Sequence, residues 1–345
     1  MSGLQYREGL CFLTFSFSLI LLITLGSILP NVLPSAYATP HLASVGDWGC
    51  SSNTKNTVKN IVNHAAPTTL ALGDNSYQST GTCWYNIVKP LDGDADTNNP
   101  KRLKITIGNH DDTPSALLNS YKKHFHLDKL YYSVNREYVH ILVLNSEDPN
   151  RSNKNSDQYK FVQADLQAAR NNSDIKWIIV EVHQPFFTSP NGCSASSCKG
   201  SKSFTQTYQP LFDQFKVDLV LFGHVHNYQR TFPVKFNPAN PLNPTKTDNT
   251  RCDYTNPTTI YGIVGTGGIN FHSLNSNKKA PFVAIQQASR FGQLDLTFSN
   301  NGNTLTGQFF SNEPGTAGQC VASSNILDRF TITKTLGAST VFLWF

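Results

Sequence analysis

Apolar runs and amphipathic segments alternate along the first two thirds of the chain, and predicted strands dominate the last third. Short uninterrupted apolar runs are typical of buried strands, whereas apolar residues that recur every three or four positions indicate a helix. The clearest helical segment is Ser156–Arg170, in which Tyr159, Val162 and Leu166 fall on one face. The predicted helices are Thr54–His64, Pro114–Phe125, Ser156–Arg170 and Thr205–Phe215. The predicted strands are Leu42–Gly46, Thr69–Leu72, Lys104–Ile107, Leu130–Val134, Tyr138–Leu144, Lys176–Val182, Val217–Phe222, Thr259–Val264, Phe291–Phe298, Thr304–Phe310 and Asp328–Thr333.

This order of elements predicts an α/β fold. Strands that first alternate with helices and then follow one another fit two mixed β-sheets packed face to face, with flanking helices. Residues 39–345 contain no internal repeat or low-complexity tract, and we expect a single domain there. Ligands of such folds gather beyond the carboxyl ends of the strands.

Five short stretches place metal-ligand residue types where predicted strands end. The stretches are Gly46-Asp47-Trp48-Gly49, Gly73-Asp74-Asn75-Ser76-Tyr77, Gly108-Asn109-His110-Asp111, Val180-Glu181-Val182-His183 and Gly223-His224-Val225-His226. Their candidate ligands are two Asp, one Tyr, one Asn and three His: Asp47, Asp74, Tyr77, Asn109, His183, His224 and His226. Oxygen and imidazole ligands in this number can hold two metal ions side by side. The ordered set therefore predicts a dinuclear metal centre and the hydrolysis of phosphate esters.

The ligand types indicate which ions the two positions prefer. A carboxylate can bridge two cations, and Asp74 is the candidate because the glycine before it allows a sharp backbone turn. Two carboxylates and the phenolate of Tyr77 are hard anionic ligands that favour Fe(III). The amide of Asn109 and the imidazoles favour a divalent ion such as Fe, Zn or Mn. His224 and His226 stand two apart, so on an extended segment they would share a face and could each reach a different ion.

The reaction expected at such a centre is attack by a metal-bound hydroxide on the phosphorus of a phosphate ester, in line with the leaving oxygen. The positive charge of the ions would offset the charge on the phosphoryl oxygens. We expect His110 to face the substrate rather than a metal ion, where it could bind phosphate or protonate the leaving group. We expect the neighbouring Asp111 to hold the His110 ring in position.

Each motif taken alone has an ordinary structural interpretation. An isolated Gly-Asp is usually part of a loop, Tyr77 alone would be a packed aromatic residue, and His183 alone a hydrogen-bonded core residue. The ordered set favours the metal centre. Gly265-Thr266-Gly267-Gly268 lacks the Lys-Ser/Thr of a phosphate loop, so it either lets backbone pass near the site or is a simple turn. The remaining histidines have no such company and are expected on the surface or in the core: His41, His64, His124, His126, His140 and His272.

The N-terminus predicts export. Arg7 precedes an apolar stretch from Leu10 to Leu29, and Ala36-Tyr37-Ala38 has the small residues of a cleavage site. We expect residues 1–38 to be a signal peptide, although the apolar stretch also has the length of a membrane anchor. The expected location is secreted or otherwise outside the cytoplasmic membrane, with membrane attachment only if this segment is retained.

Cysteine usage and charge agree with an exported enzyme of small substrates. Six Cys remain when Cys11 of the signal is set aside, and six can pair in fifteen ways. We expect three disulfides, joining Cys50 with Cys83, Cys193 with Cys198, and Cys252 with Cys320. A structural zinc site is the less favoured alternative, because no Cys-x-x-Cys spacing occurs. The net charge of +5 is spread thinly, so we expect a small phosphate-ester substrate and no nucleic-acid partner.

The ordered motifs resemble those of the calcineurin-like metallophosphoesterases. Asp-x-Gly in the first motif, and Tyr at the third place after Asp74, resemble the purple acid phosphatases within that group. Gly223 to Arg230, which reads GHVHNYQR, is particularly similar to their pattern, and the similarity spans Ser44 to Gly268. The resemblance implies a compact, single-domain form without the additional N-terminal sandwich domain of the large plant enzymes.

The resemblance also implies a role for each matching residue. Fe(III) would be held by Asp47, Asp74, Tyr77 and His226. The divalent ion would be held by Asp74, Asn109, His183 and His224. Tyr77 would give a violet colour through phenolate-to-iron charge transfer, and His110 corresponds to the substrate-facing His of the family. Family members commonly supply a further His from the loop after the fourth motif, but Thr188–Ser203 contains none, so protonation of the leaving group would depend on His110 or on a metal-bound water.

We therefore expect an exported acid phosphatase that acts on phosphomonoesters. Its pH optimum should lie below neutral, because a trivalent ion acidifies water more strongly than a divalent one. One alternative is a phosphodiesterase or nucleotidase of the same fold. An alternative of another class is a non-catalytic protein that binds metal at the cell surface, against which the complete ligand set argues.

Overall fold

The computed structural model describes residues 39–92, 102–194, 196–275, 278–315, 317, 320–321 and 323–335. The predicted signal peptide, residues 1–38, lies outside the described residues. Within these ranges every helix is too short or too polar to span a bilayer.

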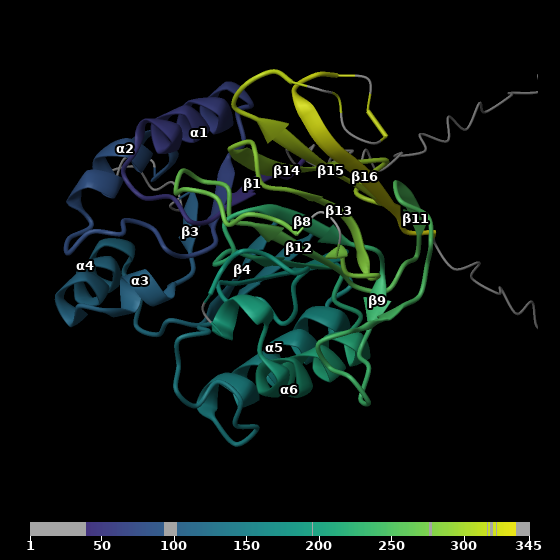
Figure 1. Ribbon diagram of the computed structural model, residues 1–345. Coiled ribbons are helices and arrows are strands. Elements are labelled where there is room, and N and C mark those ends of the chain that lie inside the picture. The colour runs from purple at the N-terminus through teal and green to yellow at the C-terminus, as the bar shows by residue number, and fades with distance from the viewer. Residues whose placement is uncertain are drawn as a thin grey trace, which may run out of the picture. The chain divides into compact units, whose positions relative to one another are not determined.

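The first of two seven-stranded mixed sheets has the strand order β11-β16-β15-β14-β1-β2-β3 (Figure 1). Its strands are β1 (His41–Val45), β2 (Thr68–Ala71), β3 (Leu103–Ile105), β11 (Asp253–Thr255), β14 (Gly292–Ser299), β15 (Thr304–Ser311) and β16 (Ile326–Thr333). Parallel pairing joins β1, β2 and β3. Strand β1 pairs antiparallel with β14, β14 with β15, and β15 with β16. The carboxyl ends of β1, β2 and β3 therefore meet at one edge of this sheet.

The second sheet has the order β13-β8-β12-β7-β6-β5-β4. Its strands are β4 (Tyr132–Arg136), β5 (Val139–Val143), β6 (Trp177–Val182), β7 (Leu219–Phe222), β8 (Tyr228–Thr231), β12 (Ile260–Val264) and β13 (Val283–Gln287). The central strands β5, β6, β7 and β12 are parallel, and the outer pairs are antiparallel. A separate short pair joins β9 (Val234–Lys235) to β10 (Thr245–Lys246).

The helices are α1 (Ser52–Asn63), α2 (Thr82–Asp92), α3 (Asn109–Asp112), α4 (Ser115–Phe125), α5 (Asp157–Asn171) and α6 (Lys202–Gln214), with a 3₁₀ turn at Ser196–Lys199. Side-chain caps fix three of the starts, because the hydroxyls of Ser51, Ser156 and Ser201 accept from backbone amides of the first turn. The Ser201 cap explains why α6 begins at Lys202 rather than at the predicted Thr205.

The apolar residues form two buried clusters, one on each face of the second sheet. Alternate residues of its strands point to opposite faces. Ile179 of β6 joins Leu42 of β1 and Leu294 of β14 in a cluster shared by both sheets. The neighbouring Val180 instead joins a second cluster with residues of α5 and α6, among them Leu166 and Phe212. The two sheets thus pack face to face with helices outside, which confirms the predicted fold class.

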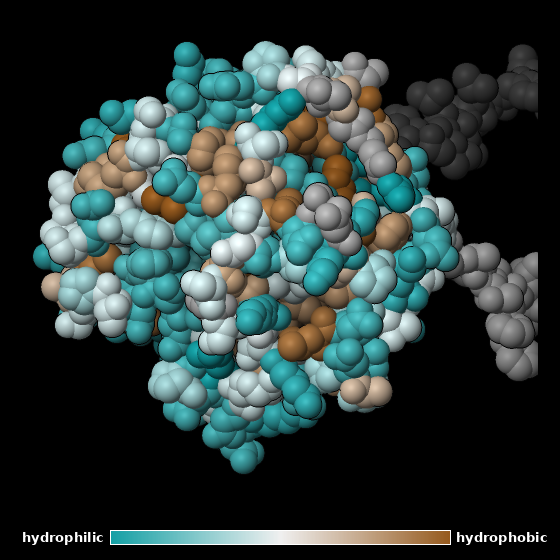
Figure 2. Space-filling view, viewed as in Figure 1, coloured by the Kyte–Doolittle hydropathy of each residue, from teal (hydrophilic) through white to brown (hydrophobic). Residues whose placement is uncertain are grey.

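The composition of the surface agrees with the burial of apolar residues in these two clusters. Among the described residues, Val62 is the one large hydrophobic side chain that is strongly exposed, at 46%. The face drawn in Figure 2 is mostly hydrophilic, with hydrophobic residues scattered between polar ones.

The strands and helices predicted from the sequence are present with shifts of a few residues at their ends. The elements that were not predicted are two helices and five strands, namely α2, α3, β8, β9, β10, β11 and β13. Strand β8 (Tyr228–Thr231) is fully buried but mostly polar, so it has no apolar pattern. Helix α2 contains Pro90, which is unusual within a helix. The three expected disulfides are present, joining Cys50 with Cys83, Cys193 with Cys198, and Cys252 with Cys320.

Candidate metal centre

The candidate ligands follow the carboxyl ends of five parallel strands, three in the first sheet and two in the second. Asp47 follows β1, Asp74 and Tyr77 follow β2, Asn109 follows β3, His183 follows β6, and His224 and His226 follow β7. Backbone hydrogen bonds tie these loops together. The Asp47 amide donates to Gly73 O at 3.0 Å, and the Gly223 amide donates to His183 O at 3.1 Å. The structure thus brings all seven side chains to one place.

One group of ligand atoms comes from Asp74, His183 and His224, and these atoms all lie within 4.8 Å of one another. His183 Nε2 is 3.3 Å from Asp74 Oδ1 and 3.2 Å from His224 Nδ1. The amide oxygen of Asn109 is also 3.3 Å from His183 Nε2. Two imidazole nitrogens, one carboxylate and one amide oxygen therefore converge.

A second group comes from Asp47, Asp74 and His226, again within 4.8 Å of one another. Tyr77 Oη lies 3.2 Å from Asp47 Oδ1 and 2.9 Å from His226 Nε2. His226 Nε2 is 3.4 Å from Asp47 Oδ1. Because Asp74 belongs to both groups, the arrangement has the form of two adjacent positions that share one carboxylate.

The backbone of four of these residues is in the left-handed region. Asp47, Asp74, Tyr77 and His224 have φ values of 60°, 52°, 56° and 67°. Residues other than glycine rarely adopt this backbone conformation, which costs of order 1 kcal/mol or more at each position. Gly108 supports the arrangement by lacking a side chain, since a Cβ there would lie 2.2 Å from Asp74 Oδ1. The loops thus hold the four side chains in fixed directions.

Outer hydrogen bonds orient the histidine rings. His183 Nδ1 donates to Leu72 O at 2.7 Å, and His226 Nδ1 donates to Asn270 O at 2.9 Å. In each ring this leaves Nε2 directed at the other candidate ligands, which is the arrangement that metal-bound histidines adopt. The ring of His224 is reversed, because its Nδ1 faces His183 and its Nε2 lies 3.8 Å from Cys198 Sγ.

The expectation of an extended segment at His224 and His226 was wrong. Two successive three-residue turns run through it, with Val225 N donating to Gly223 O at 2.8 Å and Asn227 N to Val225 O at 2.6 Å. The two histidines still belong to different ligand groups. The tight turns, rather than strand alternation, separate them.

The electrostatics of the site call for positive charge. Both Asp47 and Asp74 are buried, and Asp47 Oδ2 has no hydrogen-bond partner among the described residues. Burial alone would raise the pKa of Asp74, but His183 and the His110 amide outweigh it and hold that pKa below its usual range. Burial and the two carboxylates raise the pKa of Tyr77 well above its ordinary value. A buried carboxylate oxygen without a donor, beside a second carboxylate, fits a bound cation.

His110 lies at the rim of the site. Its side chain is exposed, and its ring lies beside that of Tyr77, with 4.5 Å between centroids and 32° between planes. Its backbone amide donates to Asp74 Oδ1 at 2.8 Å.

The expectation that Asp111 holds the His110 ring was wrong. The Asp111 carboxylate accepts from the amides of Gly108 and Asn75 and from Asn75 Nδ2, at 2.9–3.2 Å. It therefore positions the backbone of two ligand loops. Burial and the nearby Asp74 raise the pKa of Asp111 to about 7.

Sequence reasoning missed His272. Its ring stacks on that of His226, with centroids 3.9 Å apart, and its Nδ1 accepts from the His226 amide at 3.1 Å. The Gly265–Gly268 stretch brings this segment to the site, since a Cβ on Gly265 would lie 2.8 Å from Asp47 Oδ2. That glycine-rich stretch lets backbone pass close to the site, and it was the signal that could have pointed to His272.

Several other histidines pair with carboxylates elsewhere. His41 and His64 both contact Asp295 Oδ2, at 3.2 and 2.8 Å. His124 contacts Asp92, and His140 contacts Asp165, each at 2.7 Å.

Comparison with known families identifies the chain. Residues 40–228, more than half of its 345 residues, match the family model described as calcineurin-like phosphoesterase. The chain therefore belongs to the calcineurin-like phosphoesterases.

Its similar relatives include purple acid phosphatases. The chain is 33% identical over 165 residues to purple acid phosphatase 1 of Ipomoea batatas, covering 47% of this chain and 32% of that one. It is 26% identical over 293 residues to probable purple acid phosphatase 20 of Arabidopsis thaliana, covering 79% and 60%. In each of the curated relatives compared, the match spans between 28% and 60% of the relative's own length.

Solved structures share the fold. Purple acid phosphatase PPD1 from yellow lupin (Lupinus luteus) seeds aligns with a TM-score of 0.69 at 19% identity, covering 86% of this chain and 54% of that one. GAP50, the anchor in the inner membrane complex of Plasmodium, aligns with a TM-score of 0.61 at 18% identity, covering 84% and 89%.

Proposed function

We propose that this chain is an exported, metal-dependent acid phosphatase that hydrolyses phosphomonoesters at a dinuclear centre. The observation that carries the proposal is that two groups of ligand atoms, each within 4.8 Å, share Asp74. The similarity to relatives named purple acid phosphatase supports the reaction class.

The seven candidate ligands would divide between two ions. Asp47, Asp74, Tyr77 and His226 would hold Fe(III), and Asp74, Asn109, His183 and His224 would hold a divalent ion such as Fe, Zn or Mn. The hard oxygens of Asp47 and Tyr77 support the ferric assignment. When bound, two such ions supply positive charge for the phosphoryl oxygens and lower the pKa of a water molecule.

The chain's own groups would then bind the ester and supply a proton to its leaving oxygen. The exposed ring of His110 would bind a phosphoryl oxygen or protonate the leaving oxygen. Its amide donates to Asp74, which keeps the ring close to the ligand that both positions share. Asp111 would act through the loops, because it holds the amides of Gly108 and Asn75 in place.

Export and a single domain over residues 39–345 are part of the same proposal. Three disulfides support an oxidising compartment, since such bonds are rare in the cytosol. Residues 1–38 would be the signal that directs the chain there.

Two alternatives lead to different measurements. A phosphodiesterase of the same fold would prefer an ester with two organic substituents, whereas a nucleotidase would prefer a nucleoside monophosphate to other monoesters. A non-catalytic metal-binding surface protein would turn over neither kind of ester. GAP50, which has the same fold, is described as an anchor, so it is the ligand set rather than the fold that favours an enzyme.

The test compares p-nitrophenyl phosphate with bis(p-nitrophenyl) phosphate as substrates of the wild type, Asp74→Ala and Asp128→Ala. Asp128 is exposed and serves as the matched control. We expect preferential turnover of the monoester below neutral pH, a visible charge-transfer band, and loss of both in Asp74→Ala alone. Equal activity of the wild type and Asp74→Ala would contradict the ligand assignment. Preference for the diester would favour a phosphodiesterase. An optimum above pH 9 without a visible band would favour a Zn- or Mn-only relative over the iron centre.

A further inference from the structure

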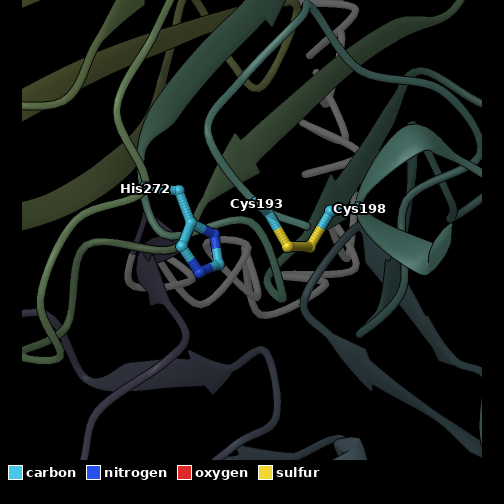
Figure 3. A group of neighbouring side chains, drawn as sticks. All are labelled: Cys193, Cys198 and His272. Atoms are coloured by element: carbon cyan, nitrogen blue, oxygen red, sulfur yellow. A yellow bond between two sulfur atoms is a disulfide. The ribbon is translucent and has the colours of Figure 1, made fainter. Parts of the chain in front are cut away.

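A second group of side chains of metal-ligand type lies next to the candidate centre. The sulfur atoms of Cys193 and Cys198 and a ring nitrogen of His272 all lie within 4.8 Å of one another. Figure 3 shows the disulfide between the two cysteines beside the ring of His272. As long as the sulfurs are bonded to each other, they are not thiolates and do not ligate a metal ion.

The backbone holds this group together independently of the disulfide. Asn191 forms a bridge with Leu274, and the Gly192 amide donates to Ser273 O at 2.6 Å. The His272 amide donates to His226 O at 2.9 Å. The loop that carries the cysteines is therefore tied to the segment that carries His272. The cysteines are only five positions apart, so the two sulfurs would stay close after reduction.

We propose that reduction of the Cys193–Cys198 disulfide creates a binding site for a thiophilic divalent ion such as Zn²⁺, with Cys193, Cys198 and His272 as ligands. Two thiolates and one imidazole are a set that zinc accepts, with water as the fourth ligand. Two thiolate charges balance one divalent ion, so the site gains no net charge when it fills. This site does not depend on the proposed phosphatase activity.

The reduction balances with a dithiol as the reductant. A thiolate of the dithiol attacks the sulfur of Cys193, the S–S bond breaks, and Cys198 leaves as a thiolate. The second thiol of the reductant then closes its own disulfide and releases Cys193. Two electrons and two protons pass from the dithiol to the protein, and binding of the ion displaces both protons to solvent. Attack at Cys193 is favoured because Cys193 is half-buried, whereas Cys198 is 1% exposed.

The site would adjoin both positions of the candidate metal centre. Cys198 Sγ is 3.8 Å from His224 Nε2, and His272 stacks on His226. An ion held by Cys198 and His272 would thus lie beside His224, a ligand of the first group, and His226, a ligand of the second.

The test uses the full chain, reduced with a dithiol and freed of it by gel filtration without oxygen, then titrated with Co²⁺. Thiolate-to-cobalt charge transfer absorbs in the near ultraviolet, and oxygen and nitrogen ligands do not give this band. We expect the band in reduced protein and not in oxidised protein. We also expect one equivalent of Zn²⁺ to abolish it and to protect Cys193 and Cys198 from alkylation.

Variants assign the band to these three residues. The double variant Cys193→Ser/Cys198→Ser should lose it, whereas Cys252→Ser/Cys320→Ser should keep it. His272→Ala retains both cysteines and should bind Co²⁺ at least about tenfold more weakly, as loss of a ligand should cost no less than loss of an outer partner. An unchanged band in the first double variant, or no band in reduced wild type, would overturn the proposal whether or not the chain is a phosphatase.

Discussion

Two buried polar clusters in the described part of the chain differ in how many of their charged atoms have a hydrogen-bond partner. In one, Arg230 Nε and Nη2 donate to the two oxygens of Asp328 at 2.6 and 2.9 Å, and Tyr228 Oη donates to Asp328 Oδ2 at 2.7 Å. Arg230 Nη1 also donates to Tyr254 Oη at 2.9 Å. In the candidate metal centre, by contrast, Asp47 Oδ2 has no partner within the described ranges.

The difference separates a structural cluster from a functional one. A buried charge is costly unless it is paired and hydrogen-bonded. The Arg230 cluster meets that requirement with its own residues and joins β8 of one sheet to β16 of the other. The metal centre leaves a carboxylate oxygen without a donor and holds four residues in the left-handed region. Such features persist at sites organised for a ligand.

The largest expected effect comes from the shared ligand. Asp74→Ala should lower turnover of p-nitrophenyl phosphate by more than about 10³-fold, because loss of one stabilising donor alone can cost 10²–10³-fold. The loss of turnover should accompany a loss of bound metal, because Asp74 belongs to both groups of ligand atoms. Steady-state kinetics and metal analysis of one preparation check the effect, with the exposed Asp128→Ala as control. Full turnover in Asp74→Ala would contradict its assignment as the shared ligand.

The opposite outcome is expected in the other cluster. Arg230→Met should lower the free energy of unfolding by about 3–5 kcal/mol, because it leaves Asp328 buried without its partner. Metal content per folded chain should not change. Urea unfolding measures the effect, with Arg102→Met as an exposed control that should change stability by less than about 0.5 kcal/mol. If the two variants are equally stable, the Arg230 cluster does not stabilise the fold.

His110 tests the rim of the centre. His110→Ala should lower turnover by about 10²-fold or more, since a positioned acid or phosphate-binding group contributes 10²–10⁴-fold. The bound metal should remain, because His110 is not among the grouped ligand atoms. Kinetics and metal analysis on one preparation separate the two effects. Loss of metal together with activity would place His110 among the ligands.

The motifs of the centre could be predicted because they are local in sequence and follow strands with strong apolar patterns. Asp47, Asp74 and His183 each follow such a strand, and adjacent parallel strands bring their ends together. The fold class followed from the same alternation of elements.

What the sequence did not reveal depends on contacts between distant segments. His272 joins the site only because the chain returns through Gly265–Gly268, and its neighbours in sequence carry no ligand pattern. Strand β8 has no apolar pattern because Gln229 and Arg230 form hydrogen bonds with the distant side chains of Thr188 and Asp328. Asp111 was assigned to the adjacent ring, whereas it binds amides of Asn75 and Gly108.

The smallest effect is expected at Asp213, in the last turn of α6. Its Oδ1 also lacks a partner among the described residues, and burial raises its pKa despite the Phe236 amide and Lys235. Between the ordinary pKa and the raised one, the folded state binds more protons than the unfolded state, so stability falls as pH rises.

Asp213→Asn should therefore stabilise the protein at pH 7 by less than about 0.5 kcal/mol, because solvent screens this partly exposed group. The gain should vanish below the ordinary carboxyl pKa. Urea unfolding at acid and neutral pH measures both values. A stabilisation of equal size at both pH values would show that ionisation of Asp213 is not its cause.

The central claim, that one carboxylate serves two metal positions, is tested most directly by metal analysis of purified protein. We predict two ions per chain in the wild type and fewer than one in Asp74→Asn, with full content in Asp128→Asn. Two ions retained in Asp74→Asn, or activity that persists after chelators have removed all metal from the wild type, would contradict the claim.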